Sequence, residues 1–341
     1  MMKWEMLTKH NKKLPEVISL GEILVEIMRK QRDVPHNIPG IYLGPYPSGA
    51  PAIFIDSVAR LGVSAGFIGV VGKDDFGQML RDRLAMDGVD TKHIRISSDH
   101  TTGTTFVMYY SSGERKFIFH LRHAAAGQLN PKDIDPNYFS NAKVLHISGS
   151  SLAISESSKE ACYKAVNIAR KREVKITFDP NLRPELINVG YIREICRPVL
   201  TVSDVVLPSK TEIEVLTGIS DPIEAAKEII KIGPKLVIVK LGGEGSIAVT
   251  KVSEIVKAPA FHINEVDPTG AGDVFDAAFV VGMLKGWPLQ KILEFANAAG
   301  AIKVTKFGPM EGPENINEVL EFIRLNEYSK KFFYRYIFYF I

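Results

Sequence analysis

The sequence predicts an α/β protein with one mostly parallel sheet and helices on both of its faces. Three observations favour this class. Apolar runs of strand length alternate with runs of helix length from residue 143 onward, and parallel strands need connections of that length. A glycine-rich loop at 267–273 opens a continuous apolar run that is typical of a buried helix. The length of 341 residues and the 45% hydrophobic content are sufficient for one large core.

The N-terminal part supplies the first strands and helices of this sheet. The pattern predicts strands at 17–28 and 64–71 and helices at 52–61 and 76–86, the first of these helices ending at Gly62. The β-type runs at 104–110 and 116–120 flank Ser111-Ser112-Gly113-Glu114, which is a hairpin signal. We expect this hairpin and the segment 29–47, which is broken by proline and glycine, to form a small sheet over the site.

The C-terminal part alternates strands and helices regularly. Predicted strands lie at 144–148, 175–178, 205–207 and 236–239, and predicted helices at 157–171 and 191–202, with two short helices up to 232 and a last helix at 289–303. Segments 247–250 and 254–258 look like antiparallel additions. We therefore expect a single domain over 14–325, with a β lid contributed by about 29–48 and 98–123. The aromatic segment 326–341 is treated as an appendage without a role in the site.

Charge and cysteine content argue against several protein classes. The 42 basic and 39 acidic side chains are interspersed and give a net charge of +3, which disfavours a nucleic-acid-binding surface. Residues 1–13 lack the apolar core of a signal peptide, and no uninterrupted apolar segment is long enough to cross a bilayer. Cys162 and Cys196 form no C-x-x-C pair and are expected to be buried thiols. Lys303 is expected to be a surface charge. We expect a cytoplasmic protein that binds neither membranes nor nucleic acid.

The loop from Asp267 to Asp273 is the strongest candidate for a functional site. The amide N–H groups of Gly270, Ala271 and Gly272 are unobstructed, and a helix that starts there adds unpaired N–H groups and a positive dipole end. These groups favour an anion, and Asp273 among them is placed to take a proton from an attacking hydroxyl. The alternative is an ordinary glycine-rich turn with an N-capping aspartate, and the loop lacks the spacing of a P-loop.

Polar and glycine-rich residues follow several predicted strands, at the edge where open α/β sheets bind their ligands. They are Asp179, Asn181 and Arg183 after 175–178, Ser209 and Glu212 after 205–207, Lys240, Gly242 and Gly245 after 236–239, and Glu26 on the first strand. Their convergence on one edge of the sheet predicts an active-site face.

The segment 267–273 resembles the D-T-G-A-G-D signature of the ribokinase-like (PfkB) carbohydrate kinases. Gly49 followed by A-R-L-G at 59–62, and V-V-G-K-D-D-F-G at 70–77, are similar to two N-terminal motifs of that family. The resemblance covers about 17–323. It implies a parallel sheet flanked by helices, with a β lid that closes over the sugar and forms a homodimer contact.

The resemblance implies a role for each matching residue on the phosphate side. Asp273 would be the general base and the amides of 270–272 the anion hole, and the helix dipole should lower the pKa of Asp273. Glu212 would hold Mg²⁺ through water, although Ser209 stands where that motif has Asn. Asp267 would bind a monovalent cation such as K⁺. The ATP site would comprise Ser209, Lys240, Gly242, Gly245, Asn297 and Gly308.

The sugar side departs from the family pattern. The resemblance implies substrate contacts from Glu26, Gly49, Ala50, Ile53, Arg122, Asp179, Asn181 and Arg183. Ile53 stands where the family usually has Asn, and Glu26 where Asp is common. The D-x-N-x-R spacing at 179–183 is similar to 2-keto-3-deoxygluconate kinases and fructokinases, and an arginine fork suits a carboxylate. The segment P-S-G-A-P-A-I-F at 47–54 is similar to a subgroup described as tagatose kinases.

These features predict ATP-dependent phosphorylation of a small sugar at a terminal hydroxyl, with a ketohexose such as tagatose or fructose as the first candidate. The second candidate is 2-keto-3-deoxygluconate, which is favoured if Arg183 faces a carboxylate. A nucleoside kinase and a non-catalytic sugar sensor are further alternatives, the sensor because Ser209 and Ile53 both break motifs. The intact loop at 270–273 argues against a sensor, which would not need a base.

Overall fold

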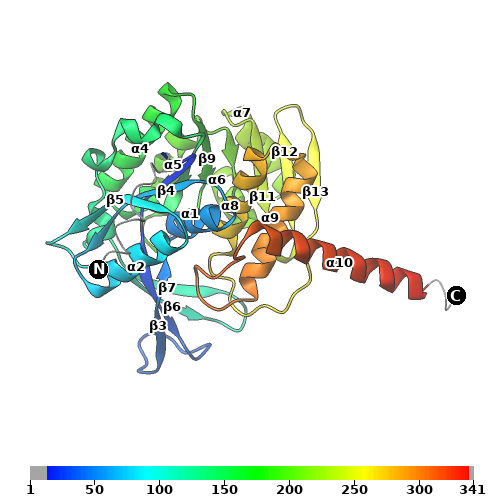
Figure 1. The fold of residues 1–341 in the computed structure, drawn as a ribbon, viewed down its shortest axis with the longest axis horizontal. Helices are drawn as coiled ribbons and strands as arrows, with labels where there is room; N and C mark the ends of the chain where they lie inside the picture. The colour runs from blue at the N-terminus through cyan, green and yellow to red at the C-terminus, as the bar shows by residue number, and fades with distance from the viewer. Residues whose placement is uncertain (1–13, 184, 338–341) are drawn as a thin grey trace, which may run out of the picture.

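Helices cover both faces of a large central sheet (Figure 1). The computed structural model describes residues 14–183 and 185–337, with side chains throughout except at 189 and 327–337. In these ranges the central sheet has the strand order β13-β12-β11-β10-β9-β8-β1-β4-β5. All neighbours from β11 to β5 are parallel, and β12 and β13 are antiparallel additions. The predicted fold class is confirmed.

Two buried core clusters lie on opposite faces of this sheet. The strands are β1 (Val17–Leu20), β4 (Ala65–Gly72), β5 (Asp90–Ser97), β8 (Val144–Ser148), β9 (Lys175–Asp179), β10 (Val205–Val206), β11 (Leu236–Lys240), β12 (Ser246–Thr250) and β13 (Ile255–Ala258). Successive side chains of a strand point to opposite faces, so Val17 packs in one cluster and Ile18 in the other. Because both faces are covered, the inner parallel strands are largely continuous apolar runs in the sequence, as in β1 and β4.

Each cluster is closed by its own set of helices. The Val17 side packs against α1 (Ala50–Arg60), α2 (Asp75–Met86), α8 (Ala271–Leu284), α9 (Leu289–Val304) and the start of α10 (Ile316–Ile337). The Ile18 side packs against α3 (Gly149–Ile154), α4 (Glu156–Lys171), α5 (Val189–Leu200), α6 (Lys210–Thr217) and α7 (Pro222–Lys231). Cys162 and Cys196 are both buried on this second side, as predicted.

A separate four-stranded sheet, which we call the lid sheet, lies at one end of the large sheet (Figure 1). Its order is β3 (Tyr42–Ser48), β2 (Leu24–Arg29), β6 (Gly103–Tyr109) and β7 (Arg115–His120). The predicted β6–β7 hairpin is confirmed, with antiparallel pairing. The predicted single strand at 17–28 is wrong, because Gly21 adopts a φ of 138° and divides it into β1 and β2. Glu26 therefore belongs to the lid sheet and not to the central sheet.

The sequence pattern does not predict two elements at the margins of the fold. Strand β5 is an edge strand with mixed polarity, and α10 is a helix that follows the predicted last helix. Phe322 of α10 packs against Phe261, with ring centroids 5.2 Å apart. The side chains of 327–337 and all of 338–341 lie outside the described residues, so the predicted role of the aromatic appendage stays a prediction.

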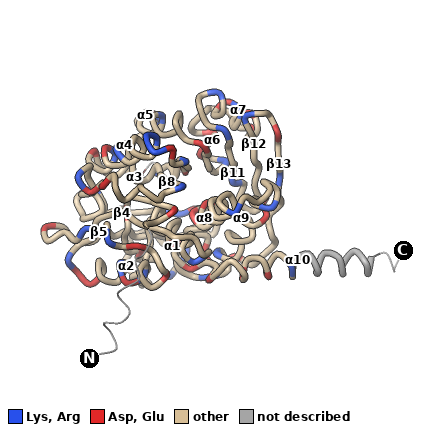
Figure 2. Tube along the Cα trace, turned by 45° about the horizontal axis from the view of Figure 1, so that its top comes forward, with Lys and Arg blue, Asp and Glu red and all other residues tan. Residues whose placement is uncertain are grey.

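The distribution of charge and hydropathy agrees with the balanced composition. Basic and acidic positions are interspersed along the chain in every layer of the fold (Figure 2). No helix in the described part of the chain is long and apolar enough to cross a membrane.

Candidate active site

A cavity of about 490 Å³ opens between the carboxyl ends of the parallel strands and the lid sheet. Because parallel strands end at one edge of a sheet, residues that are distant in sequence meet there. The predicted site residues that line the cavity are Glu26, Gly49, Ala50, Ile53, Asp179, Asn181, Arg183, Ser209, Glu212, Lys240, Gly242, Gly245, Gly270, Ala271, Gly272, Asp273 and Asn297. Arg122, Asp267 and Gly308 are not among the lining residues in the described part of the chain.

Helix α8 begins at the floor of this cavity. Its N-cap, Gly270, has a φ of 83°, and a side chain there would lie 2.4 Å from the Pro309 carbonyl oxygen. The Ala271 N–H donates to the Pro268 carbonyl at 3.2 Å. Among the described residues, no hydrogen bond occupies the N–H groups of Gly270 and Gly272, so these two are the amides best placed to receive an anion.

Asp273 lies in the first turn of α8 and is half-buried at the cavity wall. Burial raises its pKa to about 8, and the nearby carboxylate of Asp179 acts in the same direction, whereas Lys240 and Arg183 lower the pKa. The lowered pKa predicted from the helix dipole is therefore wrong, because loss of hydration outweighs the dipole. A carboxylate with this pKa is a much stronger base than an exposed aspartate.

The raised pKa of Asp273 sets an expected pH dependence. We expect kcat/KM to increase with pH up to about 8 and then to level off, because only the ionised carboxylate accepts a proton. Initial rates measured between about pH 5.5 and about pH 9.5 in buffers of constant ionic strength test this. A flat profile across this range would contradict a base of that pKa.

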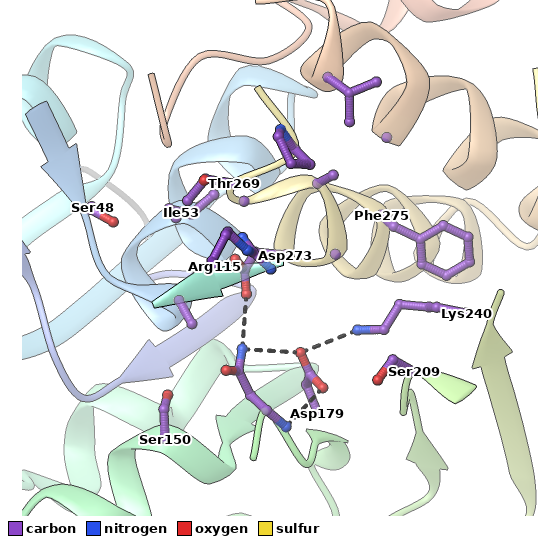
Figure 3. A pocket seen from close by; sticks show the side chains of 18 of the residues that line it. Ser48, Ile53, Arg115, Ser150, Asp179, Ser209, Lys240, Thr269, Asp273 and Phe275 are labelled. Atoms are coloured by element: carbon purple, nitrogen blue, oxygen red, sulfur yellow. Dashed lines mark hydrogen bonds and ion pairs between the residues drawn. The ribbon is translucent and has the colours of Figure 1, made fainter. Parts of the chain in front are cut away.

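Lys240 joins two buried carboxylates near Asp273, those of Asp179 and Asp276. Figure 3 shows the part of this network that includes Lys240, Asp179 and Asp273. The Lys240 ammonium lies 3.2 Å from an oxygen of Asp179, and 3.0 and 3.1 Å from the two oxygens of Asp276. The pKa of Asp276 is raised well above its usual value by burial, whereas the pKa of Asp179 is lowered because Lys240 offsets its burial. Burial thus favours the protonated form of Asp276, whereas Lys240 favours the ionised form of Asp179. Asn181 connects this network to Asp273, since its Nδ2 donates to both aspartates at 3.4 Å.

Ser209 and Glu212 form the capping box of α6, and this capping box faces the cavity. One oxygen of Glu212 accepts from the Leu182 N–H at 2.9 Å, and the other accepts from the N–H and hydroxyl of Ser209, both at 2.7 Å. No group of three or more metal-binding side chains occurs among the described residues. Mg²⁺ usually keeps several waters and is shared with phosphate oxygens, so Glu212 suits an outer, water-bridged position.

The end of the cavity next to β2 contains two buried glutamates. Glu26 accepts a hydrogen bond from the Ser48 hydroxyl at 2.9 Å, its other oxygen has no partner among the described residues, and burial raises its pKa to about 7. Glu22 accepts from the hydroxyls of Ser150 and Ser151 at 2.5 and 2.7 Å, and burial raises its pKa. Glu22 is absent from the predicted set, although its position just after the Val17–Leu20 strand is a usable signal.

Two arginines reach the same end of the cavity from different elements. Arg183 follows β9, Arg115 lies on β7, and their guanidinium carbons are 5.9 and 5.7 Å from the centre of the Phe117 ring. The predicted contribution of Arg122 does not fit this geometry, because Arg122 is exposed and donates to the Ile154 carbonyl at 3.2 Å. Arg115 lines the cavity instead, since side chains of the hairpin alternate and the register brings residue 115 to the cavity.

The predicted nucleotide residues divide into two groups. Gly242, Gly245 and Asn297 line the cavity, and the Asn297 side chain donates to the carbonyls of Ala258 and Pro259, both at 3.1 Å. Gly308 lies outside it and donates its N–H to Asp267 at 2.9 Å. Gly308 therefore supports a loop and does not face the cavity.

Comparisons with known proteins identify the family of this chain. The model of the pfkB family carbohydrate kinases matches residues 15–316. The chain is 30% identical to a 5-dehydro-2-deoxygluconokinase of Clostridium botulinum (strain Alaska E43 / Type E3), over 91% of this chain and 93% of the relative. It is 33% identical to Probable fructokinase-2 of Arabidopsis thaliana, over 91% and 96%.

Solved structures with the same fold include one that contains a nucleotide. A protein designated ribokinase II from E. coli, in complex with ATP and Mg²⁺, matches with a TM-score of 0.85 at 41% identity, over 91% of this chain and 99% of its own. The family match covers most of the chain, the fold agrees, and the signature loop lies at the cavity. The protein is thus a sugar kinase that belongs to the pfkB family of carbohydrate kinases.

Proposed function

We propose that the protein transfers the terminal phosphoryl group of ATP to a terminal hydroxyl of a small sugar, with Asp273 as the general base. The observation that carries this proposal is the position of Asp273, which lines the cavity in the first turn of α8, close in sequence to the free amides of Gly270 and Gly272 and in contact with Asn181. Binding of ATP with Mg²⁺ by the E. coli relative supports the choice of donor.

The residues of the site have different roles in the proposed reaction. Asp273 takes the proton of the attacking hydroxyl, and Asn181 holds its carboxylate in place. The N–H groups of Gly270 and Gly272 stabilise the charge on the transferred group. Bound Mg²⁺ would neutralise charge on the phosphate oxygens, with Glu212 fixing its water shell.

Unpartnered acceptors favour a polyhydroxylated substrate. Oε1 of Glu26 and Oδ1 of Asn181 are buried without a hydrogen-bond partner among the described residues, and both side chains line the cavity. A buried acceptor without a donor is costly, and sugar hydroxyls would supply the missing donors. This supports a sugar in this part of the cavity.

The two arginines favour an acidic sugar over a neutral ketohexose. In the described part of the chain, no carboxylate forms a salt bridge with Arg115 or Arg183. An arginine fork matches a carboxylate in geometry and charge. We therefore place a six-carbon keto sugar acid of the 2-keto-3-deoxygluconate class first and tagatose or fructose second. A homodimer through the lid sheet stays a prediction.

A substrate panel tests the proposed function. ADP release would be followed with ATP, Mg²⁺ and each of 2-keto-3-deoxygluconate, 5-dehydro-2-deoxygluconate, fructose, tagatose and several nucleosides. We expect the highest kcat/KM with a keto sugar acid. Preference for a neutral ketohexose would reverse the order of the candidates, and preference for a nucleoside would reject both. No turnover of any compound, with sugar binding retained, would indicate a sensor.

Replacement of Arg183 tests the acidic substrate directly. We expect Arg183→Gln to raise KM for the preferred sugar acid by about 10- to 100-fold, since a hydrogen bond to a charged group is lost, and to change KM for fructose little. Arg122→Gln is the matched control, because Arg122 lies outside the cavity. Equal effects of Arg183→Gln on acidic and neutral sugars would contradict a carboxylate contact.

A further inference from the structure

Lys303 is a fully buried lysine directly beneath the signature loop. It lies in the last turn of α9 with 0% of its side chain exposed, so its predicted place on the surface is wrong. Its ammonium donates to the Asp267 carbonyl at 2.9 Å and to the Lys306 carbonyl at 3.2 Å, and lies 3.8 Å from Oδ2 of Asp267. Two carbonyl oxygens and one carboxylate oxygen thus surround one buried cation.

Asp267 connects this cation to the loop that begins α8. Its Oδ1 accepts from the Thr269 N–H at 3.0 Å and from the Tyr109 hydroxyl at 3.1 Å. Its Oδ2 accepts from the Gly308 N–H at 2.9 Å. Thr269 directly precedes Gly270, whose N–H faces the proposed phosphoryl site, and Tyr109 belongs to the lid sheet. The Lys303 ammonium therefore neutralises Asp267, and Asp267 binds both the loop that begins α8 and Tyr109 of the lid sheet.

These residues do not fit a resident K⁺ ion at Asp267. Carbonyl oxygens are the ligands by which proteins replace the hydration shell of K⁺, and here the Asp267 and Lys306 carbonyls already bind an ammonium group. A second cation at the same oxygens would also be repelled by the first at a short distance in a buried setting. The monovalent-cation role predicted for Asp267 is therefore disfavoured.

We propose that the ammonium group of Lys303 is a built-in substitute for a monovalent cation, which positions the loop 267–270 and makes the protein independent of added K⁺. Lys303 is a positioning residue, since it acts through Asp267 and Thr269 and does not touch the cavity. The catalytic consequence rests on the proposed kinase function, whereas the structural consequence does not.

Thermal unfolding tests the structural consequence without any assay of turnover. The wild-type protein would be compared in KCl and in tetramethylammonium chloride at equal concentration, about 100 mM, so that ionic strength is matched. We expect equal Tm values for the wild type. Lys303→Ala leaves space beside the unpaired carbonyl oxygens of Asp267 and Lys306. We therefore expect this variant to have a lower Tm that KCl raises and tetramethylammonium chloride does not, or to fold only in KCl. Lys303→Met fills the space, so we expect a lower Tm without a response to K⁺.

Two results would overturn this proposal. One is a wild-type Tm that K⁺ raises and tetramethylammonium does not, because K⁺ would then bind despite Lys303. The other is a Tm for Lys303→Ala that equals the wild-type value in both salts. Lys291→Ala is the control, since Lys291 is an exposed lysine on the same helix, and it should show no specific response to K⁺.

Turnover with the best sugar of the panel tests the catalytic consequence. We expect the wild-type kcat to agree within about twofold between the two salts, and Lys303→Ala to lose about tenfold or more in kcat and to regain part of it in KCl. Wild-type turnover that requires K⁺ would refute the substitution. If the wild-type protein phosphorylates no compound of the panel, the proposed function fails, while the Tm comparison still decides whether Lys303 takes the place of K⁺.

Discussion

Replacement of Asp273 by asparagine is expected to lower kcat by about 10²- to 10⁴-fold, because the site loses the group that accepts the proton of the sugar hydroxyl. The KM for the sugar should change little, since asparagine has nearly the same shape and can still hydrogen-bond to Asn181. Steady-state ADP release at saturating ATP and sugar measures the effect. Turnover equal to that of the wild type would rule out Asp273 as the base.

The same variant has a second expected result, in stability. The pKa of Asp273 is about 8 in the folded protein and near 3.8 in the unfolded chain, so between these values the folded state binds the additional proton. This contribution to the free energy of unfolding is fully present below about pH 4 and is lost as pH rises through about 8. Asp273→Asn removes this dependence, so we expect it to unfold at a higher Tm than the wild type near pH 8. Equal Tm values at acidic and weakly alkaline pH for both proteins would contradict the raised pKa.

Lys240→Met is expected to lower the free energy of unfolding by about 3–5 kcal/mol, the range seen when one partner of a buried ion pair is removed. Lys240 is the cation that contacts both Asp179 and Asp276, and both of these side chains are at least 96% buried. Methionine fills a similar volume but leaves the ionised Asp179 without its partner. Urea-induced unfolding followed by far-UV circular dichroism measures this loss.

The control for Lys240→Met is Lys210→Met. Lys210 is more than half exposed and lies 3.9 Å from the exposed Glu244, and pairs of this kind contribute little to stability. A midpoint in urea for Lys240→Met that matches the Lys210→Met value would mean that the buried network is not a determinant of stability. Loss of kcat without loss of stability would instead give Lys240 a direct part in ATP binding, as the sequence predicts.

The sequence predicts the proposed phosphate side of the site better than the proposed sugar side. The loop 267–273 is continuous, so its glycines and Asp273 are positioned by local structure, and a glycine-rich turn before a buried helix is visible in the sequence. Arg115 could not be assigned in this way. Its position at the cavity depends on the register between β6 and β7 and on the place of the lid sheet, which are both non-local.

The sequence alone was sufficient to predict most of the alternation of strands and helices, the family, and the residues at the strand ends. These follow from periodicity and from contiguous motifs. The pKa of Asp273 and the buried position of Lys303 became evident only from the three-dimensional structure. The pKa of Asp273 depends on burial and on Asp179, which is distant in sequence, and Lys303 is held by Asp267 and Lys306. Hydration and charge are set by neighbours in space, and no local pattern contains them.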